Sequence, residues 1–496
     1  MLNDLWPPSR ARSALIVRHR ENEMNSVRFS LLLGVALAIM FSLSTRVQAQ
    51  TVTTFANFND SDGNEPFAGS LIQATDGNYY GTAFYGGTHV EGTVFQVTPS
   101  GSISAIYNFC SLPLCNDGFS PQSGVILGVD GNLYGTTYYG GPHGGGTVFK
   151  VTPAGKLTTL YRFCLTKTCP DGKEPNGLVQ ASNGNFYGTT ANLGANASGG
   201  TIFEISSAGK FKTLYNFCSK DQCTDGASPF SGLIQGSDGN LYGTTYSGGA
   251  YNSGTVFEIS PGGKFSTLYS FCAQTNCPDG SAPIGLMQAA DGSFYGTTWQ
   301  GGAYEYGSAF QFTTAHQLIT LHSFDNTDDG ASPWVPIQAN DGNFYGTTDS
   351  GSVNNAGTIY EISSSGVFSS LYNFCSSLLS CFGQYPSALS QVPNGILYGT
   401  ASGGSGDGLI FGLSNGFAPL VQTVPVAAKV GKRVMILGNG LTDATSVTFN
   451  GAPAAFTVVS STEITATVPK GATTGTVSVS TPTETLNSNP VFQVLQ

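Results

Sequence analysis

Short apolar runs alternate with polar, glycine-rich turns over most of the chain, and residues 228–271 show the pattern once in full. The four apolar runs occupy residues 232–236, 241–245, 255–259 and 264–271. A Ser-Asp-Gly-Asn turn at 237–240 joins the first two runs, and a longer loop at 246–254 precedes the third. Because Asp-Gly between apolar runs is a strong hairpin signal, the pattern predicts four antiparallel strands.

This unit recurs seven times, each time with the tripeptide Tyr-Gly-Thr at the start of the second run. The tripeptides begin 50–55 residues apart, at Tyr80, Tyr134, Tyr187, Tyr242, Tyr295, Tyr345 and Tyr398. No helical period appears after residue 50. Four strands per repeat of this length are typical of a propeller blade, so we expect an all-β fold with a seven-bladed β-propeller over residues 51–415.

Two features of the repeat are expected to be structural. The repeated tyrosines should pack between blades, and a glutamine at the end of the first run should satisfy backbone groups inside the ring. These glutamines are Gln73, Gln180, Gln235, Gln288, Gln338 and Gln391.

Asp or Asn in each hairpin turn fits the turn geometry. The oxygen ligands of a calcium loop are too sparse in these turns, so no metal is expected.

The two ends of the repeat region predict how the ring closes. Residues 52–58 match the fourth-strand pattern of 211–217 but stand before the first full unit, and the last unit stops near Leu413 after its third strand. We therefore expect the N-terminal strand to complete the last blade, which removes two exposed sheet edges. The alternative is that residues 417–423 supply the missing strand.

The period vanishes at about residue 418, and a different all-β pattern follows. Expected strands lie at 434–437, 446–449, 463–468 and 476–479. About 80 residues with short strands between glycine turns predict an immunoglobulin-like β-sandwich over residues 418–496.

The ten cysteines fall into five local pairs. These are Cys110 with Cys115, Cys164 with Cys169, Cys218 with Cys223, Cys272 with Cys277, and Cys375 with Cys381. An even count in an exported chain favours disulfides, whereas zinc would need four ligands per site and no His accompanies each pair. Because each bridge closes a very short loop, we expect the bridges to stiffen loops more than to stabilise the whole fold.

Residues 1–49 are interpreted as a signal peptide. The apolar stretch 31–43 follows Arg28, precedes Val47-Gln48-Ala49, and is too short to span a bilayer. Met24 would give a shorter leader, so Met1 and Met24 remain alternative starts, with residues 1–23 as an extension in the first case. We expect a secreted or cell-surface-associated, extracytoplasmic protein with no membrane insertion after cleavage.

The charge balance excludes two classes of partner. The chain has a formal net charge of −11, and residues after 49 include 13 basic and 27 acidic side chains. Such a chain is repelled by nucleic acid and by anionic lipid headgroups. We expect a monomer whose partner is a polysaccharide or an extracellular protein.

The repeat, with its Gly-Leu-Ile-Gln, Asp-Gly-Asn, Tyr-Gly-Thr-Thr and Gly-Thr-Val-Phe-Glu-Ile segments, resembles the GloVer (Gloeo/Verruco) tandem repeat of secreted bacterial proteins. The resemblance covers residues 51–415 and implies no particular activity. The tail, with Val447-Thr-Phe-Asn-Gly451 and Ile464-Thr-Ala-Thr-Val-Pro469, resembles an IPT/TIG domain. That resemblance implies a binding or spacer module.

Both types of long loop, between the second and third strands and between blades, are expected on one face of the propeller, which is therefore the candidate binding face. Nine residues after each repeat tyrosine lie His89, His143, Asn196, Tyr251, Tyr304, Asn354 and Asp407. Four residues after it, aromatic side chains recur at Phe84, Tyr138, Tyr246 and Trp299. Aromatic rings stack on sugar rings or on apolar partner surfaces. The alternative is that both series are ordinary exposed loop residues.

Catalysis has little support in the sequence, and no catalytic residue, cofactor or metal is assigned. If all cysteines pair, no thiol remains as a nucleophile. Non-repeated acids such as Glu305, Asp349 and Asp407 are candidates for a glycosidase, which needs two carboxylates about 5–10 Å apart. The first hypothesis is a secreted, non-enzymatic binding protein. The alternatives are a carbohydrate-active hydrolase or lyase, and a structural cell-surface protein.

Overall fold

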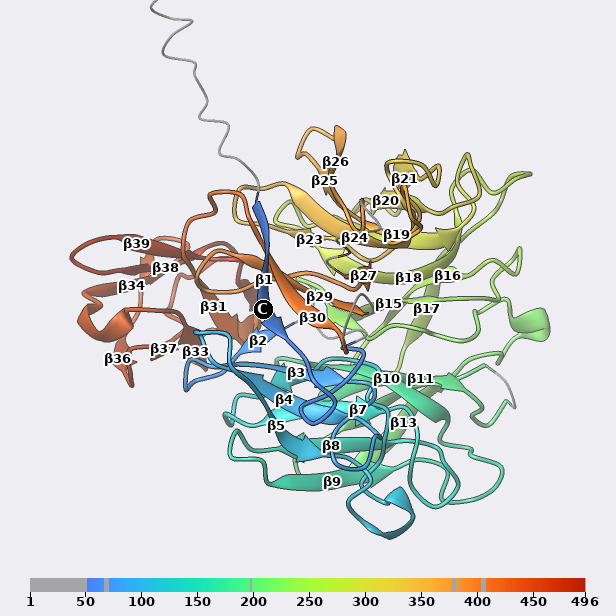
Figure 1. The fold of residues 1–496 in the computed structure, drawn as a ribbon, viewed down its shortest axis with the longest axis horizontal. Coiled ribbons are helices and arrows are strands. Elements are labelled where there is room, and N and C mark those ends of the chain that lie inside the picture. The colour runs from blue at the N-terminus through green and yellow to red at the C-terminus, as the bar shows by residue number, and fades with distance from the viewer. Residues whose placement is uncertain are drawn as a thin grey trace, which may run out of the picture. The chain divides into compact units, whose positions relative to one another are not determined.

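Each repeat forms one antiparallel sheet in the computed structural model, which describes residues 51–66, 71–196, 199–376, 381, 383–402 and 407–495 (Figure 1). The predicted signal peptide lies outside these residues. The first blade runs β2 (Ile72–Gln73), β3 (Tyr79–Ala83), β4 (Thr93–Val97) and β5 (Ile103–Asn108), in this spatial order. Consecutive strands therefore pair as hairpins, as the turn signals predict.

The next four blades repeat this order. The second is β6 (Ile126–Leu127), β7 (Leu133–Thr137), β8 (Thr147–Val151) and β9 (Leu157–Arg162). The third is β10 (Lys173–Gln180), β11 (Phe186–Asn192), β12 (Thr201–Ile205) and β13 (Phe211–Asn216). The fourth is β14 (Ile234–Gln235), β15 (Leu241–Thr245), β16 (Thr255–Ile259) and β17 (Phe265–Ser270). The fifth is β18 (Ser281–Gln288), β19 (Phe294–Gln300), β20 (Ser308–Phe312) and β21 (Leu318–Ser323).

The last two blades have their first strand in two pieces. The sixth is β22 (Ala331–Pro333), β23 (Ile337–Gln338), β24 (Phe344–Ser350), β25 (Thr358–Ile362) and β26 (Phe368–Asn373). The seventh is β27 (Gln384–Pro386), β28 (Ser390–Gln391), β29 (Leu397–Ser402) and β30 (Leu409–Ser414). Both pieces pair with the same second strand, so each blade keeps its sheet.

The N-terminal strand closes the ring, as predicted. β1 (Thr51–Asn57) pairs antiparallel with β30, from Thr51 opposite Ser414 to Asn57 opposite Leu409. In Figure 1 the blue β1 lies beside the orange strands of the seventh blade. The alternative closure is wrong, because β31 (Leu420–Val424) pairs with strands of the C-terminal domain instead.

The repeated tripeptide has a steric reason. A Cβ placed on Gly243 would lie 2.7 Å from Cζ of Phe257 on the neighbouring strand, so only glycine leaves room for that ring. The preceding Tyr242 is buried, and its hydroxyl donates to Asp238 in the hairpin turn at 2.9 Å. The predicted packing role of the repeat tyrosines is confirmed, and each tyrosine of this type also ties a turn to the core.

The structure contains all five predicted disulfides, each within a crossing loop between blades. They join Cys110 to Cys115, Cys164 to Cys169, Cys218 to Cys223, Cys272 to Cys277, and Cys375 to Cys381. The sequence separation is 5 residues in the first four bridges and 6 residues in the last. Because these separations are so short, each bridge constrains its own loop and joins no two blades directly.

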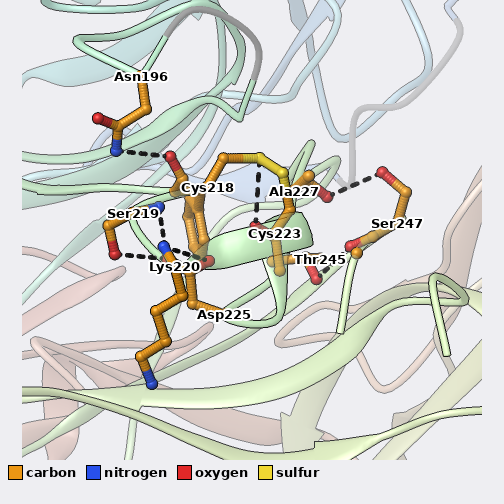
Figure 2. Close-up of a disulfide and its surroundings, with 12 residues drawn as sticks. Asn196, Cys218, Ser219, Lys220, Cys223, Asp225, Ala227, Thr245 and Ser247 are labelled. Carbon is orange, nitrogen blue, oxygen red and sulfur yellow. Dashed lines mark hydrogen bonds between the residues drawn. A yellow bond between two sulfur atoms is a disulfide. The ribbon is translucent and has the colours of Figure 1, made fainter. Parts of the chain in front are cut away.

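Beside four of the five bridges, an Asp of the crossing loop holds the loop to the outermost strand of the preceding blade. Figure 2 shows this around Asp225, whose carboxylate accepts hydrogen bonds from Ser219 Oγ at 2.7 Å and Ser219 N at 3.0 Å. The Tyr215 hydroxyl also donates to Asp225, at 2.7 Å. The loop is therefore fixed by a buried carboxylate as well as by the Cys218–Cys223 bridge.

The C-terminal domain contains a curled sheet of eight strands in the order β35-β34-β38-β39-β31-β33-β37-β36. Besides β31, these are β33 (Arg433–Leu437), β34 (Ser446–Phe449), β35 (Ala452–Pro453), β36 (Phe456–Val458), β37 (Glu463–Thr467), β38 (Val477–Ser480) and β39 (Thr485–Ser488). β32 (Ala427–Lys429) and β40 (Gln493–Leu495) form a separate pair. The sheet folds over a core that includes Val421, Ile436, Val447 and Phe449. The two layers of the predicted sandwich are thus joined through β31, which pairs with β39 and with β33.

Candidate functional site

The propeller has two unlike faces. The loops between second and third strands and the crossings between blades lie on one face, which we call the loop face. The Asp-Gly hairpin turns lie on the other, which we call the hairpin face. Since binding residues concentrate on long loops held by a rigid scaffold, the loop face is where a ligand site is sought.

Four aromatic side chains meet on the loop face at the fourth to sixth blades. We call this cluster the aromatic corner, and it consists of Phe230, Tyr246, Trp299 and Trp334. The ring centroid of Trp299 lies 5.8 Å from Phe230, 6.5 Å from Tyr246 and 5.6 Å from Trp334. All four side chains are half-buried, so each keeps some ring surface in contact with solvent.

A repeated backbone turn brings these rings together. Ser228 and Ser332, each directly before a repeat proline, have φ of 52° in the left-handed region. This turn lets the Ser228 carbonyl accept a hydrogen bond from the Tyr246 amide at 2.9 Å. Phe230, two residues after Ser228, is thereby held beside Tyr246.

The rings form a corner and not a flat platform. The interplanar angle is 88° between Tyr246 and Trp299, and 79° between Trp299 and Trp334. Edge-to-face packing of this kind is favourable for aromatic pairs, but it leaves no two coplanar faces side by side. The corner therefore fits one ring-shaped group with an apolar face better than it fits the surface of an ordered, flat polymer.

Asp349 occupies, in the sixth blade, the repeat position that Trp299 occupies in the fifth. Burial raises the pKa of its carboxyl group. Among the described residues, no hydrogen bond or ion pair to this side chain is found. The charged form of Asp349 is therefore destabilised in the folded protein.

This burial predicts a pH-dependent effect of the substitution Asp349→Asn. A carboxyl group whose pKa is raised on folding costs stability once pH rises through that pKa, and the amide removes this cost. We expect the variant to be more stable than the wild type at pH 7, with the difference shrinking as pH falls toward about 4, the usual Asp range. Urea unfolding at several pH values measures it. A difference that is constant with pH would contradict the prediction.

The other two aromatic members of the series lie outside the corner. The Tyr138 hydroxyl donates to Glu174 at 3.0 Å, and burial followed by the Glu174 charge raises the tyrosine pKa. Glu174 also pairs with Lys173, at 3.3 Å. Phe84 packs edge-on against Tyr85, with ring centroids 4.6 Å apart. The structure thus brings together Tyr246 and Trp299 of this series and leaves Phe84 and Tyr138 with other neighbours.

The second series, nine residues after each repeat tyrosine, is divided in its roles. Asn196 donates to the backbone carbonyl of Phe217 at 3.0 Å (Figure 2 shows Asn196 beside the Cys218 loop), and Asn354 donates to that of Cys375. Asp407 accepts from Asn64 at 3.2 Å. The other four side chains, His89, His143, Tyr251 and Tyr304, are exposed. Asn196, Asn354 and Asp407 therefore hold loops in place. The four exposed side chains are the members of this series that solvent or a ligand can reach.

Two members of the corner escaped the sequence analysis. Phe230 and Trp334 each directly follow a repeat proline, at a position where the other blades carry Phe67, Gln122, Asn176, Ile284 and Ser387. Comparing this position across the repeats would have shown these aromatics. Among the described residues, no group of three or more His, Cys, Asp or Glu side chains is placed to hold a metal ion.

Comparisons with known proteins identify the family of the repeat and of the C-terminal domain. The Gloeobacter/Verrucomicrobia repeat matches residues 38–237, 114–277 and 232–424. The IPT/TIG domain matches residues 421–494. No curated protein matches the chain.

Solved structures with a similar fold have low identity. The extracellular domain of a hybrid two-component system from B. thetaiotaomicron is 12% identical with a TM-score of 0.48, and the match covers 90% of this chain and 58% of that one. The extracellular domain of a one-component system from the same organism is 13% identical with a TM-score of 0.45, covering 88% and 57%. A gluconolactonase from Xanthomonas campestris is 14% identical with a TM-score of 0.36, covering 57% and 81%.

The chain spans 58% and 57% of the two extracellular domains, less than two thirds of either. In the part of the chain that the structure describes, no helix is long and apolar enough to cross a membrane. The repeat matches together run from residue 38 to residue 424, most of the 496 residues. The chain therefore belongs to the Gloeobacter/Verrucomicrobia repeat family and carries an IPT/TIG domain at its C-terminal end.

Proposed function

We propose that the protein is a secreted, non-enzymatic binding protein whose aromatic corner holds a sugar unit of a neutral glycan. The observation that carries this proposal is the meeting of Phe230, Tyr246, Trp299 and Trp334 on the loop face with their rings partly exposed. The apolar face of a sugar stacks on such rings, while polar groups nearby bond its hydroxyls.

Charge narrows the ligand class to neutral glycans. The chain has a formal net charge of −11, and the half-buried Asp349 lies at the same repeat position as Trp299. A polyanionic glycan would meet electrostatic repulsion over the whole approach. A neutral glycan avoids this cost, and its hydroxyl groups donate hydrogen bonds that a carboxylate can accept.

The disulfides support an extracytoplasmic location. All ten cysteines are paired, and disulfides of this number persist in oxidising compartments. Each bridge stiffens its own crossing loop, and five of the seven crossings carry one. Rigid loops lose less entropy on binding than mobile ones.

A glycan array with the protein from residue 50 onward, followed by titration of the best oligosaccharide, tests the proposal. We expect Trp299→Ala to weaken binding about 30-fold, since a central aromatic contact contributes about 2 kcal/mol. Phe84→Ala is the matched control, because Phe84 has the same repeat position but lies outside the corner, and it should bind like the wild type.

Two results would overturn the proposal. One is that the intact protein binds no glycan on the array and none in plant or microbial polysaccharide extracts, while a surface protein is captured instead. The other is that Trp299→Ala and Phe84→Ala weaken binding equally. Release of shortened oligosaccharides from a bound polysaccharide would favour the alternative of a hydrolase or lyase.

A further inference from the structure

A glutamine ladder links most neighbouring blades on the hairpin face. It consists of Gln180, Gln235, Gln288, Gln338 and Gln391, each at the end of an innermost strand. Each Nε2 donates to the glycine carbonyl of its own turn, and each Oε1 accepts the backbone N–H of the preceding blade's turn. The accepting distances are 2.9 Å from Val129, 3.0 Å from Ser182, 3.1 Å from Ser237, 2.9 Å from Ala290 and 3.0 Å from Asn340.

The ladder is broken on both sides of the first blade. The second blade has Leu127 where the other blades have glutamine, so no amide reaches the turn of the first blade. The seventh blade has Pro393 at the turn position, and proline has no N–H to donate. The Oε1 of Gln73 is consequently buried without a hydrogen-bond partner among the described residues. Each of the other five junctions has one such bond, or rung, whereas the junctions of the first blade with the seventh and with the second blade have none.

The C-terminal domain makes hydrogen bonds at these same two places. Thr462 Oγ1 donates to the carbonyl of Thr75 in the turn of the first blade, at 2.6 Å. Asn439 Oδ1 accepts from Nε2 of Gln73 at 3.2 Å. The Leu420 amide donates to the carbonyl of Pro393 at 3.0 Å. Both turns that lack a ladder bond are therefore among the turns that the C-terminal domain contacts.

Further contacts extend the attachment to the sixth and seventh blades. Gln422 Nε2 donates to the carbonyl of Gln391 at 2.7 Å. Asn489 Nδ2 donates to the carbonyl of Gln338 and to Oε1 of Gln391, both at 2.8 Å. These bonds end on Gln338 and Gln391, whose own ladder bonds are intact, so the C-terminal domain also holds blades where the ladder is unbroken.

Apolar packing accompanies the hydrogen bonds. Leu437 is 1% exposed and belongs to the same core cluster as Ala74 and Val125 of the first two blades. Met435 and Val424 pack against the same cluster. Burial of these apolar side chains is favourable, so this contact adds to the polar bonds.

The C-terminal domain also faces the inner strands of the third to sixth blades. A cavity of about 280 Å³ separates the inner-strand side chains Val179, Ile234 and Met287 from Pro490 and Val491. Those inner-strand residues thus face the C-terminal domain across a small space.

We propose that the IPT/TIG domain is a clamp on the seam between the seventh, first and second blades, and not a free spacer or binding module. It makes other hydrogen bonds, through Asn439, Thr462 and Leu420, at the two junctions whose ladder bond is missing, and it covers the apolar seam with Leu437. We therefore expect the stability of the propeller to depend most on this domain at the two junctions of the first blade, where the ladder bonds are missing.

Hydrogen exchange of the intact protein tests the clamp. The triple substitution Gln422→Ala, Asn439→Ala, Thr462→Ala should speed exchange at least about tenfold in β1, β2, β3 and β30, and leave β14–β20 unchanged, because local opening governs exchange. The control Thr457→Ala, Lys470→Ala, Thr483→Ala alters exposed side chains that make no hydrogen bond to the propeller, and should match the wild type.

A repair variant keeps the test decisive. Leu127→Gln with Pro393→Ser restores both ladder rungs, and we expect it to return exchange at the seam of the triple variant to within about threefold of the wild type. If the triple variant does not fold, the repaired triple variant should. Unchanged exchange at the seam in the triple variant, equal acceleration in all blades, or no effect of the repair would each overturn the clamp.

Discussion

Phe58→Ala will lower the free energy of unfolding by about 3–5 kcal/mol, the usual cost of deleting a buried phenylalanine. Phe58 is 6% exposed and packs edge-on against Phe95 of the first blade, with centroids 4.9 Å apart. Its amide donates to the carbonyl of Gly408 in the seventh blade at 3.0 Å. The residue therefore joins the first blade to the last, and its loss weakens the closure of the ring.

Urea unfolding followed by tryptophan fluorescence measures this effect, with Thr54→Ala as the control. Thr54 is an exposed residue on β1, so its substitution should change stability by less than about 0.5 kcal/mol. Deleting residues 51–58 should abolish cooperative unfolding, because β30 becomes an unpaired edge. A deletion variant that unfolds like the wild type would show that the strand does not close the ring.

Asp225→Ala will destabilise the protein by about 3–5 kcal/mol, more than breaking the disulfide beside it. Asp225 is fully buried, and its removal leaves the Tyr215 hydroxyl, the Ser219 hydroxyl and the Ser219 amide without their acceptor. Each of these bonds ends on a carboxylate and contributes about 1.5–3 kcal/mol. Because Ser219 is exposed, water replaces part of what its two donors lose.

The comparison variant is Cys218→Ser with Cys223→Ser. The cysteines are 5 residues apart, and a loop of this length gives a disulfide an entropic contribution of only about 2 kcal/mol. Thermal or urea unfolding of the two variants under the same conditions decides the order. If the cysteine variant loses more stability than Asp225→Ala, the carboxylate is not the main anchor of the crossing loop.

The blades and their closure were predictable because the determining signals are local. Gly243 has to be glycine because Phe257 packs on it, so the tripeptide recurs with the blade. Residues 52–58 carry the fourth-strand pattern although they precede the first full unit. This pattern alone assigns them to the seventh blade, whose own repeat stops after its third strand. Turn residues such as Asp238-Gly239 give the strand limits closely for the same reason.

The site was less predictable because it depends on contacts between blades. The spacing of Tyr246 and Trp299 indicated aromatic residues on one face, but not which rings meet. Phe230 reaches Tyr246 through the left-handed turn at Ser228, which no composition signal marks at a non-glycine residue. Asn196 aligned with exposed residues in the sequence, yet its amide is occupied by the Phe217 carbonyl.

The clamp was not predictable from the C-terminal sequence. Asn439 and Thr462 lie in turns of the kind that any small β-domain contains, and nothing in their spacing indicates a partner. The missing rungs at Leu127 and Pro393 are visible in the sequence only once the ladder bonds are known. Long-range pairing of single side chains leaves no period for sequence analysis to detect.

The proposed sugar site is tested most directly by a crystal structure of the protein with the oligosaccharide that binds best on the array. We expect one sugar ring to lie against Trp299 on the loop face, within reach of Phe230 and Tyr246, with the C-terminal domain still seated on the hairpin face. Sugar bound on the hairpin face or on the C-terminal domain, with the aromatic corner empty at saturating ligand, would contradict it.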